Sequence, residues 1–331
     1  MTTTSTTTAY LLGASVALTT GVALYAYLSL PTPIRIPKRV ILLRHGESEG
    51  NVDHHIYETK ADNSIHLTST GWDQAINIGK QLKKIIGNEE SVRFFVSPYV
   101  RTRETLAGVA QSFGGFESMR TNSQIKSDTN HWSGSRKLVW TEDPRIREQD
   151  FGNYQNREAM TKAKKDRSRF SPFYYRFQGG ESAADVFDRV SLFFASMYRN
   201  WHRKIGSLDN HNTILVCHGI TIQIFFMRWF RYNVDEFCTY DNPRNCEAAV
   251  FEREYNVEKK KYVLKFSHLL LPDGTRENER RKRTYKTLRR RINLKKPLET
   301  LHGNESDCSV EIINKRASDS ELDKKWGTMR A

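Results

Sequence analysis

Short apolar runs alternate with longer amphipathic stretches over residues 38 to 270 of this 331-residue chain. The short runs have the length of buried strands, and apolar residues three and four positions apart predict helices. Strands are predicted at residues 40–43, 93–96, 213–217, 248–254 and 261–267, and helices at 70–86, 99–105, 157–169, 183–201 and 220–229. This repeated alternation predicts an α/β protein, a three-layer α/β/α sandwich with a mostly parallel central sheet.

The connections between these elements carry weaker signals. Ser69 or Thr70 is expected to cap the helix at 70–86, and Gly87 is expected to end it. Residues 53–64 are polar and irregular, which favours a solvated loop. Residues 113–138 are rich in Gly, Ser, Thr and Asn, which predicts a surface insertion.

Two of the predicted strands run directly into a His-Gly pair. The run at 40–43 ends in Arg44-His45-Gly46, and the run at 213–217 ends in His218-Gly219. Either histidine alone is most simply a hydrogen-bonded structural residue. If the two strands are neighbours in one sheet, however, both imidazoles reach the edge where open α/β sheets bind ligands. The adjacent guanidinium of Arg44 favours an anionic ligand there.

A third cationic group follows the strand at 93–96. Arg101 falls in the first turn of the next helix, where a positive charge opposes the helix dipole unless an anion is bound. Arg103 is expected to be a surface or ion-pair residue.

The segment RHGESEGN at 44–51 resembles the signature of the histidine phosphatase superfamily, the phosphoglycerate mutases and related phosphatases. The segments EDPRIREQDFGNYQ at 142–155 and GGESAAD at 179–185 resemble a plant and fungal phosphoglycerate-mutase-like branch. The motifs occur in the family's order, and the resemblance covers most of residues 38–270. Similarity to this branch implies a phosphatase more than a mutase.

The resemblance also implies roles for individual residues. His45 would attack phosphorus and form a phosphohistidine, and Glu148 would protonate the leaving group. The phosphoryl group of a phosphorylated substrate would be bound by Arg44, Asn51, Arg101 and His218, with Ser48 and Gly219 as further contacts. The resemblance implies neither a metal nor a cofactor. A phosphoglycerate mutase and a membrane-tethered, non-catalytic scaffold are the alternatives.

The net charge of +14 is unevenly distributed. Residues 276–296 alone carry +9, so we expect a domain at 37–272 followed by a basic, disordered tail at 273–331. The basic residues at 279–296 could contact anionic lipid, which we prefer over nucleic acid. The four cysteines form no zinc pattern and suit a reducing compartment.

The first 36 residues form a leader. Residues 9–30 contain no charge and are long enough to cross a bilayer as a helix, which predicts a transmembrane anchor. Arg35, Lys38 and Arg39 follow it, so the catalytic domain is expected to face the cytosol. A signal or targeting leader is the alternative for this segment, with a soluble cytoplasmic protein as the alternative location.

Overall fold

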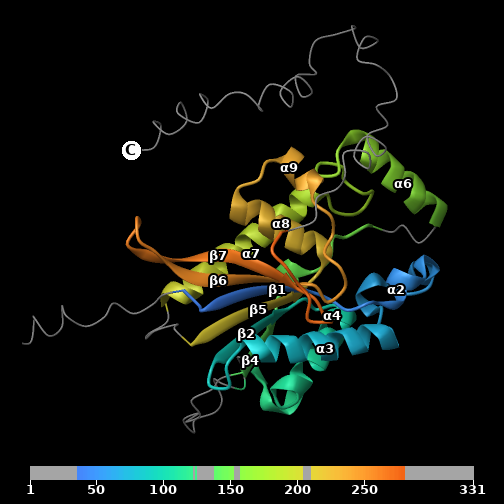
Figure 1. Ribbon diagram of the computed structural model, residues 1–331. Coiled ribbons are helices and arrows are strands. Elements are labelled where there is room, and N and C mark those ends of the chain that lie inside the picture. Colours follow the sequence, from blue (N-terminus) through green and yellow to red (C-terminus); the bar gives the residue numbers. More distant parts are fainter. Residues whose placement is uncertain (1–35, 122–123, 125–137, 153–156, 204–209, 280–331) are drawn as a thin grey trace, which may run out of the picture.

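The computed structural model describes residues 36–121, 124, 138–152, 157–203 and 210–279. They form one central sheet with helices packed around it (Figure 1). The sheet has eight strands in the order β3-β4-β2-β5-β1-β6-β7-β8. Their bounds are Arg39–Arg44 for β1, Ser91–Val96 for β2, Arg120–Thr121 for β3, Leu138–Glu142 for β4, His211–Cys217 for β5, Ala248–Asn256 for β6, Lys261–Leu270 for β7 and Arg276–Glu277 for β8.

The strands from β3 to β1 in this order are parallel, whereas β6, β7 and β8 add antiparallel pairs at the other side. β1 and β5 are direct neighbours, and Arg44 lies opposite Cys217 in their register. The two strands that precede the histidines therefore end at the same level of the sheet.

Helices cover both faces of this sheet (Figure 1). The α-helices are α2 at Glu49–Val52, α3 at Ser69–Ile85, α4 at Val100–Ala110, α6 at Arg157–Phe170, α7 at Ala183–Arg203, α8 at Gly219–Phe230 and α9 at Val234–Thr239. Short 3₁₀ turns are η1 at His54–Glu58, η2 at Asp62–Ser64, η3 at Gln111–Phe113, η4 at Phe116–Ser118 and η5 at Pro144–Ile146.

Alternation along β1 explains the layers. Ile41 and Leu43 belong to the core beneath α3 and α4, while Val40 and Leu42 belong to the core beneath α7 and α8. All four side chains are fully buried, and burial of each contributes roughly 1.5–3 kcal/mol. The prediction of a three-layer α/β/α sandwich is confirmed.

One of two local predictions for α3 was wrong. The hydroxyl of Thr68, rather than that of Ser69 or Thr70, accepts a hydrogen bond from the backbone N–H of Gly71, at 3.0 Å. The helix ends at Ile85 with the extended residue Ile86 as its C-terminal cap, and Gly87 follows directly, without a positive φ.

None of the helices within the described ranges is long and apolar enough to cross a bilayer. The predicted anchor at 9–30 lies outside those ranges, as do all of the basic residues within 279–296 and most of the insertion at 113–138. The anchor, the membrane location and the lipid contact stay predictions.

Candidate active site

The sheet brings the two histidines together. His45 directly follows β1, and its backbone N–H donates to the carbonyl oxygen of Cys217 at 3.0 Å, which aligns the ends of β1 and β5. His218 comes next in the chain and caps the N-terminus of α8. The ring centroids of His45 and His218 are 5.3 Å apart, and both residues are buried.

The imidazole of His45 is fixed with one nitrogen facing the site. Its Nδ1 lies 2.7 Å from the carbonyl oxygen of Gly46, and because a carbonyl only accepts, Nδ1 carries the proton. Burial, together with the charges of Arg101 and Arg44, lowers the pKa of His45 well below its usual value. Nε2 therefore keeps a free lone pair, as a nucleophile requires.

A serine holds the ring of His218. The hydroxyl oxygen of Ser97 lies 2.7 Å from His218 Nε2 and also accepts the backbone N–H of Tyr99, at 3.4 Å. We assign the Ser97 hydroxyl as the donor to Nε2, which places the proton of the neutral ring on Nδ1. Burial and the charge of Arg101 lower the pKa of His218 well below its usual value. Nδ1, which faces Glu148, has no hydrogen-bond partner among the described residues.

Two guanidiniums border the imidazoles. Arg101 is 3 % exposed, and its Nη1 donates to the backbone carbonyl and to Oδ1 of Asp62, at 2.6 and 2.8 Å. Burial lowers the pKa of Arg101, but Asp62 and Glu148 outweigh it, so the pKa lies above the usual value. Arg44 donates through Nη1 to the carbonyl of Pro243, and its buried Nε has no partner in the described part of the chain. A buried donor without a partner is costly, which favours a ligand at this position.

Glu148 lies beside His218 and Arg101 and completes the set of side chains at the site. Its Oε2 lies 3.5 Å from His218 Nδ1 and 3.9 Å from Arg101 Nη2, and its Oε1 accepts the backbone N–H of Gln149. Burial raises the pKa of Glu148, although Arg101 opposes the shift. The carboxyl group therefore retains its proton at higher pH than an exposed glutamate, as a general acid requires.

His45, Glu148 and His218 also form a set that could ligate a metal. One ligand atom from each residue lies within 4.8 Å of the others, and two histidines with a glutamate are ligand types that zinc accepts. Arg44 and Arg101, however, place two positive charges beside this set. The donor set therefore fits an oxyanion better than a cation.

The remaining predicted contacts differ in their position. Asn51 lines a cavity at the site, and its Oδ1 accepts from the backbone N–H and the hydroxyl of Ser48. Ser48 is 1 % exposed and lies behind Asn51, so its geometry is that of a support for Asn51. Gly219 begins α8 and lines a different cavity, which does not include Asn51.

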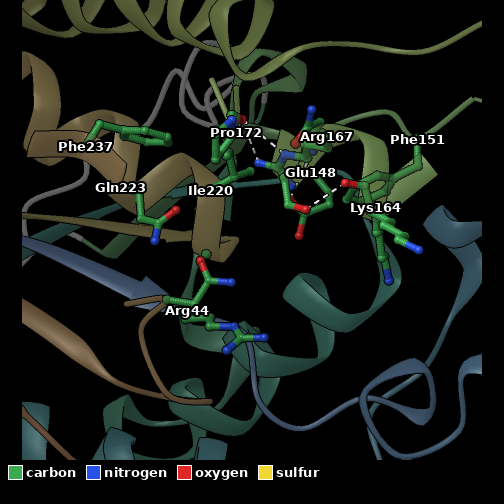
Figure 2. A pocket seen from close by; sticks show the side chains of 14 residues that line it. Arg44, Glu148, Phe151, Lys164, Arg167, Pro172, Ile220, Gln223 and Phe237 are labelled. Atoms are coloured by element: carbon green, nitrogen blue, oxygen red, sulfur yellow. Dashed lines mark hydrogen bonds between the residues drawn. The ribbon is translucent and has the colours of Figure 1, made fainter. Parts of the chain in front are cut away.

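The two cavities share Glu148, Phe151, Lys164 and Asn242 as wall residues. The first, of about 600 Å³, is lined by Arg44, Glu148, Gln149, Phe151, Lys164, Lys165, Arg167, Ser168, Pro172, Gly219, Ile220, Gln223, Phe237 and Asn242 (Figure 2). We call it the α6 cavity. The second, of about 660 Å³, is lined by residues 51–63 in part, Tyr99 and residues 148–164 in part, and we call it the loop cavity.

Sequence reasoning missed Asp62, Ser97 and Tyr99. The loop at 53–64 is largely solvated as expected, but Asp62 turns inward from it to pair with Arg101. Arg103, by contrast, pairs at the surface with Glu142, as expected. Ser97 stands at the end of β2, and its position after a buried strand was the one signal that could have identified it.

A family model described as the histidine phosphatase superfamily (branch 1) matches residues 40–137 and 128–264. The phosphoglycerate mutase-like protein AT74 of Arabidopsis thaliana is 43 % identical over 66 % of this chain, and the match covers 65 % of that protein. The broad-range acid phosphatase DET1 of Saccharomyces cerevisiae is 29 % identical over 69 % of this chain and 89 % of its own length. The solved structure "Mycobacterial hydrolase 1" shares the fold, with a TM-score of 0.50 and 19 % identity over 69 % of this chain and 97 % of that one.

The chain belongs to the histidine phosphatase superfamily, because the family model matches more than half of it. Family membership and a phosphatase-named relative support a phosphoric monoester hydrolase.

Proposed function

We propose that this protein hydrolyses phosphate monoesters through a phosphohistidine on His45. The observation that carries the proposal is the unprotonated Nε2 of His45 beside donors that converge on one point. That point is marked by Glu148 Oε2, which lies within 4 Å of donors on both His218 and Arg101. A phosphoryl oxygen bound beside this carboxyl group can accept hydrogen bonds from the same donors.

In the first step, Nε2 of His45 attacks phosphorus, and the bond from phosphorus to the ester oxygen breaks. The protonated carboxyl of Glu148 gives its proton to that leaving oxygen. Arg44, Arg101 and the Nδ1–H of His218 stabilise the negative charge on the equatorial oxygens throughout.

In the second step, water attacks the phosphohistidine. The Glu148 carboxylate accepts a proton from this water, the phosphorus–nitrogen bond breaks, and inorganic phosphate leaves. The site thereby returns to its starting protonation, with Nε2 of His45 free and Glu148 protonated.

The test is the hydrolysis of p-nitrophenyl phosphate by the full chain and by a His45→Asn variant. We expect kcat to fall at least about a thousandfold, because no other group replaces the nucleophile. A matched control is His66→Asn, which alters an exposed histidine that lines neither cavity and should leave kcat within about twofold of wild type.

Activity close to wild type in the His45→Asn variant would contradict the mechanism. Phosphoglycerates provide a second arm, because hydrolysis releases inorganic phosphate whereas a mutase only isomerises them. Isomerisation without free phosphate would favour the mutase alternative.

A further inference from the structure

The hairpin of β6 and β7 extends past the end of the sheet that lies opposite the phosphoryl site. His45 and His218 follow the carboxyl ends of β1 and β5, whereas Arg39, at the amino end of β1, lies opposite Glu252 of β6. Beyond Glu252, β6 pairs with β7 alone among the described strands. Figure 1 shows the hairpin projecting away from α2 and α6. We call residues 253–265 the hairpin tip.

Three large apolar side chains are exposed on the hairpin tip. Tyr255 is 54 % exposed, Val257 77 % and Tyr262 43 %. Tyr255 lies opposite Tyr262 in the register, and their ring centroids are 5.2 Å apart. Clustered apolar groups on a surface mark an interaction site, and tyrosine suits the boundary between water and lipid because its ring is apolar and its hydroxyl is polar. The hairpin tip therefore exposes side chains that gain by leaving water.

Three consecutive lysines, residues 259–261, lie beside these apolar side chains. All three are exposed, and none makes an ion pair or a side-chain hydrogen bond with another residue of the described ranges. Lys265, by contrast, pairs with Glu254 at 2.6 Å. The hairpin tip contains five Lys or Arg and two Glu, so it carries a net positive charge. This charge is concentrated at the turn, where an anionic surface can reach it.

Local contacts fix the shape of the hairpin tip. In the turn, the backbone N–H of Lys259 donates to Oδ1 of Asn256 at 2.8 Å, and Lys260 adopts a left-handed φ of 47°. On the strands, the guanidinium of Arg253 lies 5.2 Å from the ring centroid of Tyr262. Because the turn and the strands have a defined conformation before any partner binds, docking costs little conformational entropy of the backbone.

The chain enters β1 beside the hairpin tip. Arg253 donates from its backbone N–H to the carbonyl oxygen of Lys38 at 3.0 Å, and from Nη1 to that of Ile36 at 3.3 Å. The uncharged stretch 9–30 ends six residues before Ile36, and six residues span at most about 20 Å. If the predicted anchor crosses a bilayer, this tether holds the hairpin tip near the bilayer surface and leaves the phosphoryl site at the far end of the sheet.

The combination of charge and apolar exposure favours lipid over nucleic acid as the partner. Lysines can contact the phosphates of either one. Val257, however, is the most exposed of the three apolar side chains, and a valine gains nothing from a phosphate backbone. It is removed from water when it enters the boundary between headgroups and acyl chains. A bilayer therefore accounts for both kinds of side chain on the hairpin tip.

We propose that the hairpin tip docks on the surface of a bilayer that contains anionic lipid. The lysines at 259–261 contact lipid phosphates, and Tyr255, Val257 and Tyr262 enter the boundary between headgroups and acyl chains. This docking surface goes beyond the proposed function and does not depend on it, because it lies at the end of the sheet opposite His45.

The experiment places an environment-sensitive nitrobenzoxadiazole label on the hairpin tip of the full chain. Val257→Cys is labelled in a Cys238→Ser/Cys308→Ser background, in which the remaining Cys217 and Cys246 are buried. The protein is mixed with phosphatidylcholine vesicles that contain about 30 % phosphatidylserine. Emission is divided by the amount of vesicle-bound protein, measured by co-sedimentation, so that other membrane-binding segments do not contribute. We expect emission to rise at least about threefold as the label leaves water.

A matched control carries the label at Val52→Cys in the same background. Val52 is also an exposed valine, at 68 %, but it belongs to α2, which lies at the other end of the sheet (Figure 1). The label at this position should stay in water when the protein is bound to vesicles. Its emission should therefore not rise.

A second pair of variants tests the charges. The rise at position 257 should fall to less than about half in Lys259→Gln/Lys260→Gln/Lys261→Gln, because each lysine near an anionic bilayer contributes to binding. It should be unchanged when three exposed cations of α6 are removed, in Lys162→Gln/Lys165→Gln/Arg169→Gln. All of these substitutions are at exposed positions, so the thermal unfolding temperatures of the variants should agree.

Three results with vesicle-bound protein would overturn the proposal: no rise at position 257, an equal rise at position 52, or a rise that survives the lysine substitutions. The proposal also fails if the full chain does not bind these vesicles. A rise with duplex DNA but not with vesicles would instead make the hairpin tip a nucleic-acid contact.

Discussion

At the scale of single residues, the environments of His45 and Glu148 shift two pKa values in opposite directions. Burial and two guanidiniums lower the pKa of His45 below 6.5, whereas burial raises the pKa of Glu148 above 4.5. The first shift extends the neutral form of the imidazole to lower pH, and the second extends the protonated form of the carboxyl to higher pH. These are the forms that a nucleophile and a general acid need.

The pH dependence of kcat/KM for an alkyl phosphate should therefore be bell-shaped. As pH falls through the lowered pKa of His45, Nε2 gains a proton and the rate falls. As pH rises through the raised pKa of Glu148, the acid loses its proton and the rate falls again. The expected pH–rate profile has its acidic limb at lower pH than an unperturbed imidazole would give and its basic limb at higher pH than an unperturbed glutamate would give.

The Glu148→Gln variant tests whether Glu148 is the general acid. An amide cannot donate a proton to the leaving oxygen, so kcat for an alkyl phosphate should fall by about 10²–10⁴-fold. The loss for p-nitrophenyl phosphate should be smaller, since that leaving group departs without protonation. Equal losses for both substrates would exclude Glu148 as the general acid.

At the scale of elements, the end of β2 helps to orient the catalytic side chains, as the ends of β1 and β5 do. Ser97 follows β2 directly, is fully buried, and directs the ring of His218. Ser97→Ala removes the hydroxyl from Nε2, so the proton can move from Nδ1 to Nε2. We expect kcat to fall about ten- to a hundredfold with a smaller change in KM, and Ser97→Thr to restore part of the activity. A change confined to thermal stability would assign Ser97 a structural role alone.

An element could be predicted from the sequence where a short stretch of residues carries a distinctive pattern. The apolar runs that end at His45 and His218 identified two strands, because a buried strand has a distinctive pattern, and the structure shows that these strands are neighbours. The start of α3 was wrong because Thr68, Ser69 and Thr70 can all cap a helix. Only the extended backbone of Thr68, with φ −75° and ψ 170°, distinguishes it.

Close packing between elements is less visible in a sequence. A Cβ atom on Gly46 would lie 2.5 Å from the carbonyl oxygen of Gly71, so the loop after β1 passes directly against the start of α3. The pairing of Asp62 with Arg101 likewise joins an irregular loop to a helix. No periodic pattern links these positions, and the sequence alone could not reveal them.

At the scale of the whole molecule, charge divides the surroundings of the phosphoryl site. Basic side chains dominate the charged lining of the α6 cavity, whereas the loop cavity combines several carboxylates with Lys60 and Lys164, and Glu148 and Lys164 line both. The sandwich fold could be predicted because strands and helices alternate throughout the domain. The two cavities could not, since their walls combine α6, α8 and the loops around residues 54–63 and 148–152.

The most direct test of the mechanism is to trap phosphate on the protein. The Glu148→Gln variant should be mixed with radiolabelled p-nitrophenyl phosphate, quenched in base and digested for mass spectrometry. With its good leaving group, this substrate should phosphorylate His45, while the missing carboxylate slows hydrolysis of the intermediate. The account predicts a base-stable, acid-labile phosphoryl group on His45 that is absent from a His45→Asn/Glu148→Gln variant. Label on another residue, or the same label in both proteins, would contradict it.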